Sequence, residues 1–180
     1  MLSVREMQLS DVASIIQYWL GSDATHLLAM GVDLAKVPSR DDLAAMLQEQ
    51  IELPLEAKRS YGLIWELEGR AIGHSNTNPT YFGDHAFMHL HLWGAVHRKK
   101  GLGTELVQLS LPHFFSKLQL EVLYCQPYAL NPAPNKTLAK AGFEFLKEYI
   151  TVPGSINLEQ SVKLWKMSRE RFDSLALTAQ

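Results

Sequence analysis

The sequence has almost no cysteine, almost no net charge and no long apolar run. Cys125 is the single cysteine among the 180 residues, so an internal disulfide is excluded. No segment approaches the ~18 consecutive apolar residues that a membrane-spanning helix needs. Residues 1–11 contain no apolar run of signal-peptide length. The sequence therefore predicts a cytoplasmic protein without a membrane partner.

The charges are nearly balanced, with 17 Lys and Arg against 19 Asp and Glu. A protein that binds nucleic acid through its phosphates needs a surplus of basic residues on one face, so nucleic acid is not expected as a partner. The sequence also has no low-complexity tract, charge block or internal repeat that would mark a linker. One domain over residues 1–180 is expected, and a core of this size needs no metal or disulfide for stability.

The apolar residues alternate between helical and extended periodicity along the chain. Helical spacing predicts helices that begin at Ser10 and Ser39, because serine caps helix N-termini. A third helix is opened by Gly101 and kinked or shortened by Pro112, and a fourth, short one ends at Gly142. Strands are predicted over residues 2–7, 61–67, 70–76, 86–93, 120–125, 143–151 and 161–167, with a last helix over 168–177. This order predicts an α/β fold with a central sheet.

The strongest local feature is a strand that runs through a basic loop into a helix. The loop reads His97-Arg98-Lys99-Lys100-Gly101-Leu102-Gly103-Thr104. Glycines let backbone N–H groups approach an anion closely, and the helix N-terminus adds donors and partial positive charge. The loop therefore predicts a phosphate or pyrophosphate site, although a tight turn that simply needs glycine would read the same. It is neither a Walker loop nor a dinucleotide fingerprint.

Two blocks of the sequence resemble the GNAT-family N-acetyltransferases. Arg98-x-x-Gly101-x-Gly103 after a strand is similar to the family's Arg/Gln-x-x-Gly-x-Gly/Ala pyrophosphate loop. Asn131, eleven residues before Gly142-Phe143, is similar to the start of the family's helix that closes over the coenzyme. With the matching element order, the resemblance covers residues 2–167. It is nearest the branch of ribosomal-protein and small-molecule acetyltransferases.

The resemblance implies a fold and a reaction. The fold would be a mixed, mostly antiparallel central sheet flanked by helices, with two splayed strands that hold the coenzyme. Acetyl-CoA would be the cosubstrate, and a primary amine would attack its thioester directly in a ternary complex. The acceptor is left open between a small molecule, an amino acid and a protein N-terminus. An acyl-enzyme is not expected, because Cys125 lacks a Cys-x-His partner and is placed in the core, away from the acceptor side.

The resemblance also implies which residues bind the coenzyme. The backbone from Arg98 to Thr104 would hold the pyrophosphate, and Asn131 and Asn135 would contact the pantetheine arm before their helix begins. The strand backbone at 91–93 would line the arm, opposite residues 120–125, and one of its N–H groups would polarise the thioester carbonyl. The complete set of implied coenzyme residues is His91, Leu92, Trp93, Arg98, Lys99, Lys100, Gly101, Leu102, Gly103, Thr104, Asn131 and Asn135.

The sequence departs from the family at the residue that protonates the leaving thiolate. The family often has a tyrosine four residues before the Gly-Phe pair, and Leu138 stands there. Acid catalysis from that position is therefore excluded. Tyr124 and Tyr128 are the candidates to replace it, although a thiolate is a good leaving group for which water can suffice.

The general base must also be sought among other residue types, because no Asp or Glu lies between His85 and Trp93. Histidine titrates near neutral pH and suits this role. His89 is the first candidate and His91 the second, since both lie on one face of their strand. The alternative for each is a buried histidine satisfied by hydrogen bonds. Glu66 is a minor candidate for a second base that acts through water.

Three further questions stay open from the sequence. His74, His89 and His91 could supply three imidazoles to a metal, but no carboxylate or thiol completes the set and no metal is expected. A coenzyme A-binding sensor without turnover is the rival from the class of binding proteins, and a homodimer is left open. Acceptor specificity is expected from residues 22–38 and 77–85, which lack the dense acidic cluster that a polyamine or an aminoglycoside would require.

Overall fold

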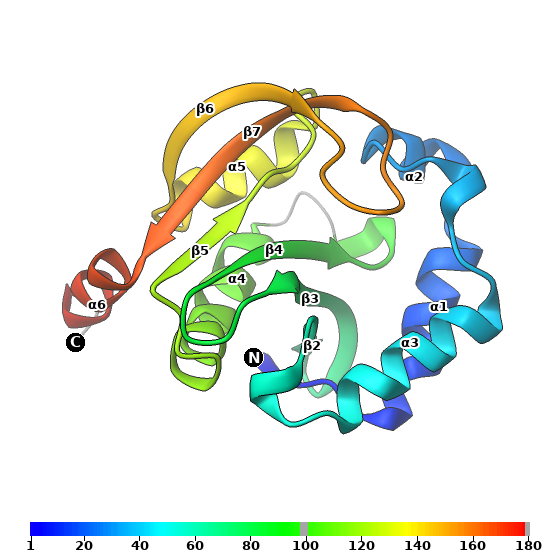
Figure 1. Cartoon of the computed structure of the whole chain (residues 1–180), viewed down its shortest axis with the longest axis horizontal. Helices are drawn as coiled ribbons and strands as arrows, with labels where there is room; N and C mark the ends of the chain where they lie inside the picture. Colours follow the sequence, from blue (N-terminus) through cyan, green and yellow to red (C-terminus); the bar gives the residue numbers. More distant parts are fainter. Residues whose placement is uncertain (98–100, 179–180) are drawn as a thin grey trace.

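The computed structural model describes residues 1–97 and 101–178 and contains one seven-stranded sheet in the order β1-β2-β3-β4-β5-β7-β6 (Figure 1). The strands are β1 Leu2–Glu6, β2 Tyr61–Leu67, β3 Arg70–Thr80, β4 His85–Leu92, β5 Val122–Cys125, β6 Glu144–Thr151 and β7 Gln160–Ser168. The helices are α1 Val12–Gly21, α2 Ala24–Ala29, α3 Arg40–Glu52, α4 Leu102–Pro112, α5 Pro132–Lys140 and α6 Arg169–Thr178. Neighbouring strands are antiparallel except β4 and β5, which confirms the expected mixed, mostly antiparallel sheet. No helix in the described ranges is long and apolar enough to cross a membrane.

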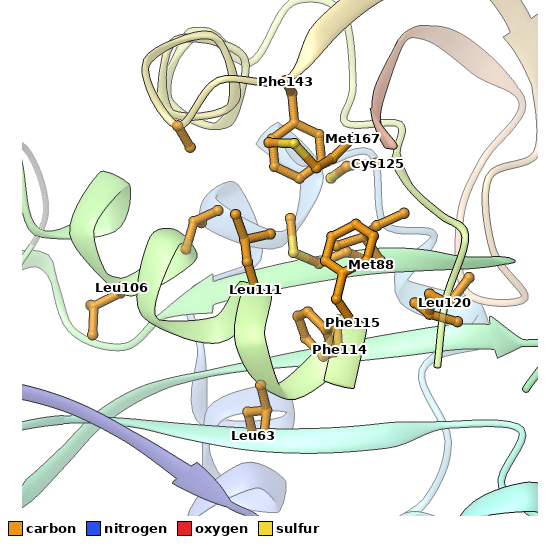
Figure 2. Close-up of a cluster of buried hydrophobic side chains, with 14 of the residues drawn as sticks. Leu63, Met88, Leu106, Leu111, Phe114, Phe115, Leu120, Cys125, Phe143 and Met167 are labelled. Atoms are coloured by element: carbon orange, nitrogen blue, oxygen red, sulfur yellow. The ribbon is translucent and has the colours of Figure 1, made fainter. Parts of the chain in front are cut away.

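The main core fills the space between one face of the sheet and α4. Side chains alternate along a strand, so Leu63, Trp65 and Met88 point to this face together. Figure 2 shows Met88 gathered with Phe114 and Phe115, which lie just beyond the end of α4. The Trp65 indole N–H, which is buried here, donates to the Ser110 hydroxyl at 2.9 Å. This layer covers one face of the sheet and leaves the opposite face for other elements.

The opposite face of the sheet is covered by α1 and α3, which lie side by side (Figure 1). Their contact is a small apolar cluster of its own around Val12, Ile16 and Leu43, apart from the main core. The Ser39 hydroxyl accepts a hydrogen bond from the Asp42 backbone N–H and caps α3, as the sequence predicts. The two helices thus pack mainly on each other, and the cavity described below lies between them and the sheet.

Strands β4 and β5 separate after a short paired stretch. Their parallel pairing joins His85–Phe87 to Val122–Tyr124 and ends there, while β4 continues to Leu92. The second half of β4 therefore keeps β3 as a neighbour on one side only. The splayed strand pair that the family resemblance implies is present.

The structure corrects several predicted boundaries. β3 runs to Thr80 and not to residue 76, because a bulge after Thr77 lets pairing resume at Thr80 with Ala86. β5 begins at Val122, two residues later than predicted. The interval 22–38, left unassigned from the sequence, holds α2 and a 3-10 turn at Leu34–Lys36.

Of two predictions that involve proline, the structure confirms one and contradicts the other. Pro112 ends the regular part of α4, after which the chain makes a π-helical turn over His113–Lys117, so the predicted interruption is confirmed. The expectation that Asn135 lies before its helix is wrong. α5 begins at Pro132, because proline at the first helical position is already set to helical φ, and Asn135 falls inside the helix.

Candidate active site

The turn into α4 has the geometry of an anion site. Gly101 caps the helix with φ of +78°, a left-handed conformation that glycine adopts without steric cost. A Cβ atom added to Gly103 would lie 3.4 Å from Thr137 Oγ1, so α4 packs closely on α5 at this end. The first backbone N–H groups of a helix favour an anion. The basic residues Arg98, Lys99 and Lys100 lie outside the described residues.

A cavity of about 690 Å³ extends from the splayed edge of β4 to the α1–α3 pair. We call it the central cavity. Its lining includes Ile15, Trp19, Leu43, Met46, Leu47 and Ile51 from α1 and α3, His74, Asn76, Met88, His89, Leu90 and His91 from β3 and β4, and Cys125, Gln126, Pro127, Tyr128, Asn131 and Pro134 from the end of β5 to the start of α5. The volume is that of a pocket for a small molecule. One continuous space therefore joins the gap between the strands to the helical wall.

Two histidines from neighbouring strands lie against each other in this cavity. His74 and His91 are register partners on β3 and β4, and their rings stack at 4.6 Å between centroids. The Trp93 indole N–H donates to His74 Nδ1 at 2.8 Å. Burial lowers the pKa of His74 to about 3 and lowers the pKa of His91 well below its usual value. Both imidazoles are therefore neutral near pH 7.

Tyr18 joins this histidine pair to helix α2. Its hydroxyl lies 3.2 Å from His91 Nδ1 and 3.3 Å from His26 Nε2. The edge of the Trp19 ring also packs on His91, at 4.9 Å between centroids. The hydroxyl has a single proton, so when it donates to one imidazole the other imidazole must donate to it. The sequence gives Tyr18 no role and His26 no partner, because their contact with His91 depends on the tertiary fold.

His89 precedes His91 by two residues in β4 and lies on the same face of the sheet. Its Nε2 is 2.8 Å from the Asn78 carbonyl oxygen. A carbonyl only accepts, so Nε2 carries the proton and Nδ1 carries the lone pair. Burial lowers the pKa of His89. The three histidines do not form a ligand cluster, since no group of three His, Cys, Asp or Glu side chains could hold a metal ion within residues 1–97 and 101–178.

The two asparagines predicted to contact the coenzyme differ in their environments. Asn131 lines the central cavity, and its side chain caps α5 by accepting from the Ala133 N–H. The Asn135 amide donates to the Tyr128 and Asn131 carbonyls at 3.1 and 2.8 Å and accepts from the Trp165 indole N–H at 2.8 Å. All its polar atoms are thus occupied by the protein. The structure gives Asn135 the role of holding the turn that presents Asn131.

The two candidate tyrosines also differ in their environments. Tyr128 lines the central cavity. Tyr124 stacks on Phe87 at 5.2 Å where β4 and β5 are still paired, and it does not contribute to the lining. Leu138, which stands at the family's tyrosine position, is fully buried in the core. Tyr128 is therefore the candidate acid that the geometry retains.

Three other predicted residues acquire defined partners. The Trp93 backbone N–H donates to the Ile72 carbonyl at 2.7 Å, so this one of the three expected strand donors belongs to the sheet. Glu66 accepts from Arg5 Nε at 2.8 Å and lies outside the cavity lining, which leaves it no part as a second base. Cys125 lies in the core as expected, and it also borders the central cavity, at the end of β5.

Comparisons with known proteins agree with this geometry. The profile of the family described as "Acetyltransferase (GNAT) domain" matches residues 2–144. No curated protein matches the sequence. Among solved structures, the chain is similar to spermidine N-acetyltransferase from Vibrio cholerae in complex with CoA and spermine, with 18% identity, a TM-score of 0.75 and coverage of 95% of this chain and 97% of that chain.

Two further solved structures show the same fold. Aminoglycoside acetyltransferase AAC(6')-Ib in complex with coenzyme A and kanamycin is 20% identical, with a TM-score of 0.73 and coverage of 98% of this chain and 99% of that chain. RimL, a ribosomal L7/L12 alpha-N-protein acetyltransferase in complex with coenzyme A, is 15% identical, with a TM-score of 0.75 and coverage of 94% and 95%. These likenesses establish the architecture.

Proposed function

The chain belongs to the GNAT acetyltransferase family, and from that premise we propose that it transfers the acetyl group of acetyl-CoA to an amine in a ternary complex. The observation that carries the proposal is the central cavity, which connects the splayed edge of β4 with a separate wall on α1 and α3. A two-substrate transfer needs such a space, because both reacting groups must meet away from water. The solved relatives described above were crystallised with coenzyme A.

The residues at the α4 end of the gap fit the coenzyme. Its pyrophosphate would lie on the backbone from Gly101 to Thr104, where the helix N-terminus supplies donors. The pantetheine arm would occupy the gap beside the part of β4 that no longer pairs with β5, with Asn131 on the opposite wall. Acetyl-CoA supplies an activated acyl group. Arg98, Lys99 and Lys100 are proposed to add positive charge to the pyrophosphate site, and the backbone of His91 and Leu92 to line the arm.

His89 is the proposed general base. Its Nε2–H donates to the Asn78 carbonyl oxygen, so Nδ1 is the ring nitrogen whose lone pair can accept a proton. His91 is the second candidate, although its Nδ1 is engaged with Tyr18. Desolvation in a cavity lined by neutral imidazoles disfavours the ammonium form of the entering amine, which favours the nucleophilic neutral form. Tyr128 is the proposed proton donor to the departing thiolate.

Binding of acetyl-CoA by calorimetry tests the coenzyme site, and the chain offers a matched pair of variants. Gly101 and Gly69 both have positive φ, +78° and +73°, and a Cβ atom meets nothing within 4 Å at either. Gly101→Asp and Gly69→Asp therefore carry similar backbone strain and the same charge. We expect Gly101→Asp to weaken binding by roughly 30-fold or more, since a carboxylate near a pyrophosphate costs about 2 kcal/mol. Equal affinities of the two variants would overturn the pyrophosphate assignment.

Release of free thiol from acetyl-CoA with a panel of amines tests turnover. We expect thiol release that depends on the amine, together with formation of the acetylated amine. A protein that binds acetyl-CoA tightly but releases no thiol with any amine would instead be a coenzyme A-binding sensor. The sensor is a specific alternative because β4 contains no Asp or Glu that could act as the general base.

A further inference from the structure

The wall of the central cavity that faces the histidines is apolar. It is formed by one side of α1 and α3 and includes Ile15, Trp19, Leu43, Met46, Leu47 and Ile51. Four of these residues also take part in the small cluster between the two helices, so the wall is held in place by their packing. A surface of this kind favours an apolar molecule, at roughly 25 cal/mol for each Å² removed from water.

Charged side chains are scarce in the cavity. Among the lining residues that the structure describes, Glu6 and Lys58 are the only Asp, Glu, Lys or Arg. Glu6 is paired with Lys117 Nζ at 3.5 Å. The Lys58 ammonium donates to the Gln50 carbonyl and, at 2.9 Å, to the Ile51 carbonyl at the end of α3. Both charged groups thus have partners. Residues 98–100 and 179–180, which lie outside the described residues, include no Asp or Glu.

A molecule with several ammonium groups would be poorly accommodated here. Each ammonium that leaves water without a carboxylate partner costs several kcal/mol, while the amine that reacts can enter as the neutral base. A second ammonium on the same molecule must also lose its proton, or it enters the cavity with its charge and pays the full desolvation cost. The cavity therefore discriminates by the number of charges on the acceptor.

The connection between β6 and β7 also lines the cavity, with Pro153, Ile156 and Asn157 among its residues, and it reaches the segment after α2 (Figure 1). The Asp33 N–H donates to the Ile156 carbonyl at 2.8 Å, and the Leu158 N–H donates to the Gly31 carbonyl at 3.1 Å. The Asn157 side-chain amide also donates to the Gly31 carbonyl, at 3.1 Å. A lining segment held in place in this way limits the length of an acceptor and disfavours a folded protein terminus.

We infer that the acceptor is a small amine with a single ammonium group on an apolar body. This inference rests on the proposed acetyl transfer and narrows its substrate class. Hexylamine and 1,6-diaminohexane form a matched pair of probes, since they have the same chain length and differ by the second amine. We expect kcat/KM for hexylamine to exceed that for the diamine by about 30-fold or more. A preference for the diamine, for spermidine or for a tetrapeptide N-terminus would overturn the inference.

A pair of variants on α3 tests whether the wall sets this preference. Met46 lines the central cavity and is exposed enough to accept a polar side chain, whereas the exposed Ala45 beside it does not line the cavity. Met46→Glu should reduce the preference for hexylamine over the diamine by about tenfold, and Ala45→Glu should leave it unchanged. Equal ratios in both variants would overturn the role of the wall.

Failure of this inference can be told apart from failure of the proposed function. Calorimetry with acetyl-CoA, run on the same preparations, reports the coenzyme site without any amine. Binding of acetyl-CoA with turnover of the diamine in preference to hexylamine would reject the acceptor class alone. Absence of acetyl-CoA binding would reject the acetyl transfer on which the inference rests.

Discussion

The indole N–H of Trp93, the residue after β4, donates to Nδ1 of His74 in the middle of β3 at 2.8 Å. This bond requires a lone pair on Nδ1, so protonation of that atom would break it. His74 is 3% exposed and stacks on His91, whose protonation would place a second charge against it. The His74 and His91 side chains that line the central cavity are therefore held in their uncharged forms.

The first prediction concerns stability in acid. The pKa of His74 is about 3 in the folded protein against 6.5 for an ordinary histidine, so only the unfolded chain takes up this proton between those values. Stability is thus present above pH 6.5 and is lost progressively as the pH falls toward 3. We expect His74 alone to lower the free energy of unfolding by about 2 kcal/mol between pH 7 and pH 5. Urea unfolding at the two pH values measures the loss.

A pair of variants isolates the contribution of His74. His74→Gln keeps an acceptor for the Trp93 indole and removes the titration, so it should flatten the decrease by the amount assigned to His74. His113→Gln, in the π-helical turn on the other face of the sheet, should retain the decrease. A His74→Gln protein with the full pH dependence would show that the loss arises elsewhere.

The second prediction concerns Asn135, whose amide makes three hydrogen bonds inside the protein. Asn135→Ala removes them and leaves the Trp165 indole N–H without this acceptor. We expect a loss of about 3 kcal/mol in the free energy of unfolding. Asn131→Ala removes only a helix cap and should cost about 1 kcal/mol. Thermal unfolding of the two variants compares them, and a smaller loss for Asn135→Ala would contradict the role assigned here.

Local signals in the sequence predict much of the fold. Gly101 and Gly142 take the positive φ values that their turns require, Ser39 caps its helix, and Pro112 ends regular helix where predicted. Each of these depends on residues within a turn or two along the chain, so the sequence shows them directly. The two blocks of the family resemblance are of the same kind.

The parts that the sequence does not predict depend on contacts between distant segments. Tyr18 meets His91 across 73 positions, and Asn135 meets Trp165 across 30. In the sequence Tyr18 lies within the predicted helix that begins at Ser10, and Asn135 lies in a stretch predicted to precede its helix. Neither position carries a local pattern that names its partner, so only the assembled sheet and helices reveal these roles.

The third prediction concerns Cys125. Burial raises the pKa of its thiol to about 12, so the thiol is protonated near neutral pH and is a poor nucleophile. We expect the mass of the intact protein to stay unchanged after incubation with acetyl-CoA, because in the proposed ternary complex the acetyl group passes directly to the amine. Iodoacetamide should modify Cys125 slowly in the folded protein and rapidly after unfolding in guanidinium. An acetylated protein that transfers its acetyl group to an added amine would refute the direct transfer.

The last prediction concerns the pH dependence of turnover. Burial lowers the pKa of His89, so its neutral form persists below pH 6.5, and a general base there loses activity only at lower pH. The Asn78 carbonyl fixes Nε2–H, and a glutamine at this position keeps an N–H donor for that bond. We expect His89→Gln to lower kcat by about 100-fold and to remove from the pH–rate profile the part of the acid limb that His89 causes, with acetyl-CoA affinity unchanged. Because the amine titrates identically in both proteins, the difference between the two profiles isolates His89. A full rate in His89→Gln together with a loss in His91→Gln would instead assign the base to His91.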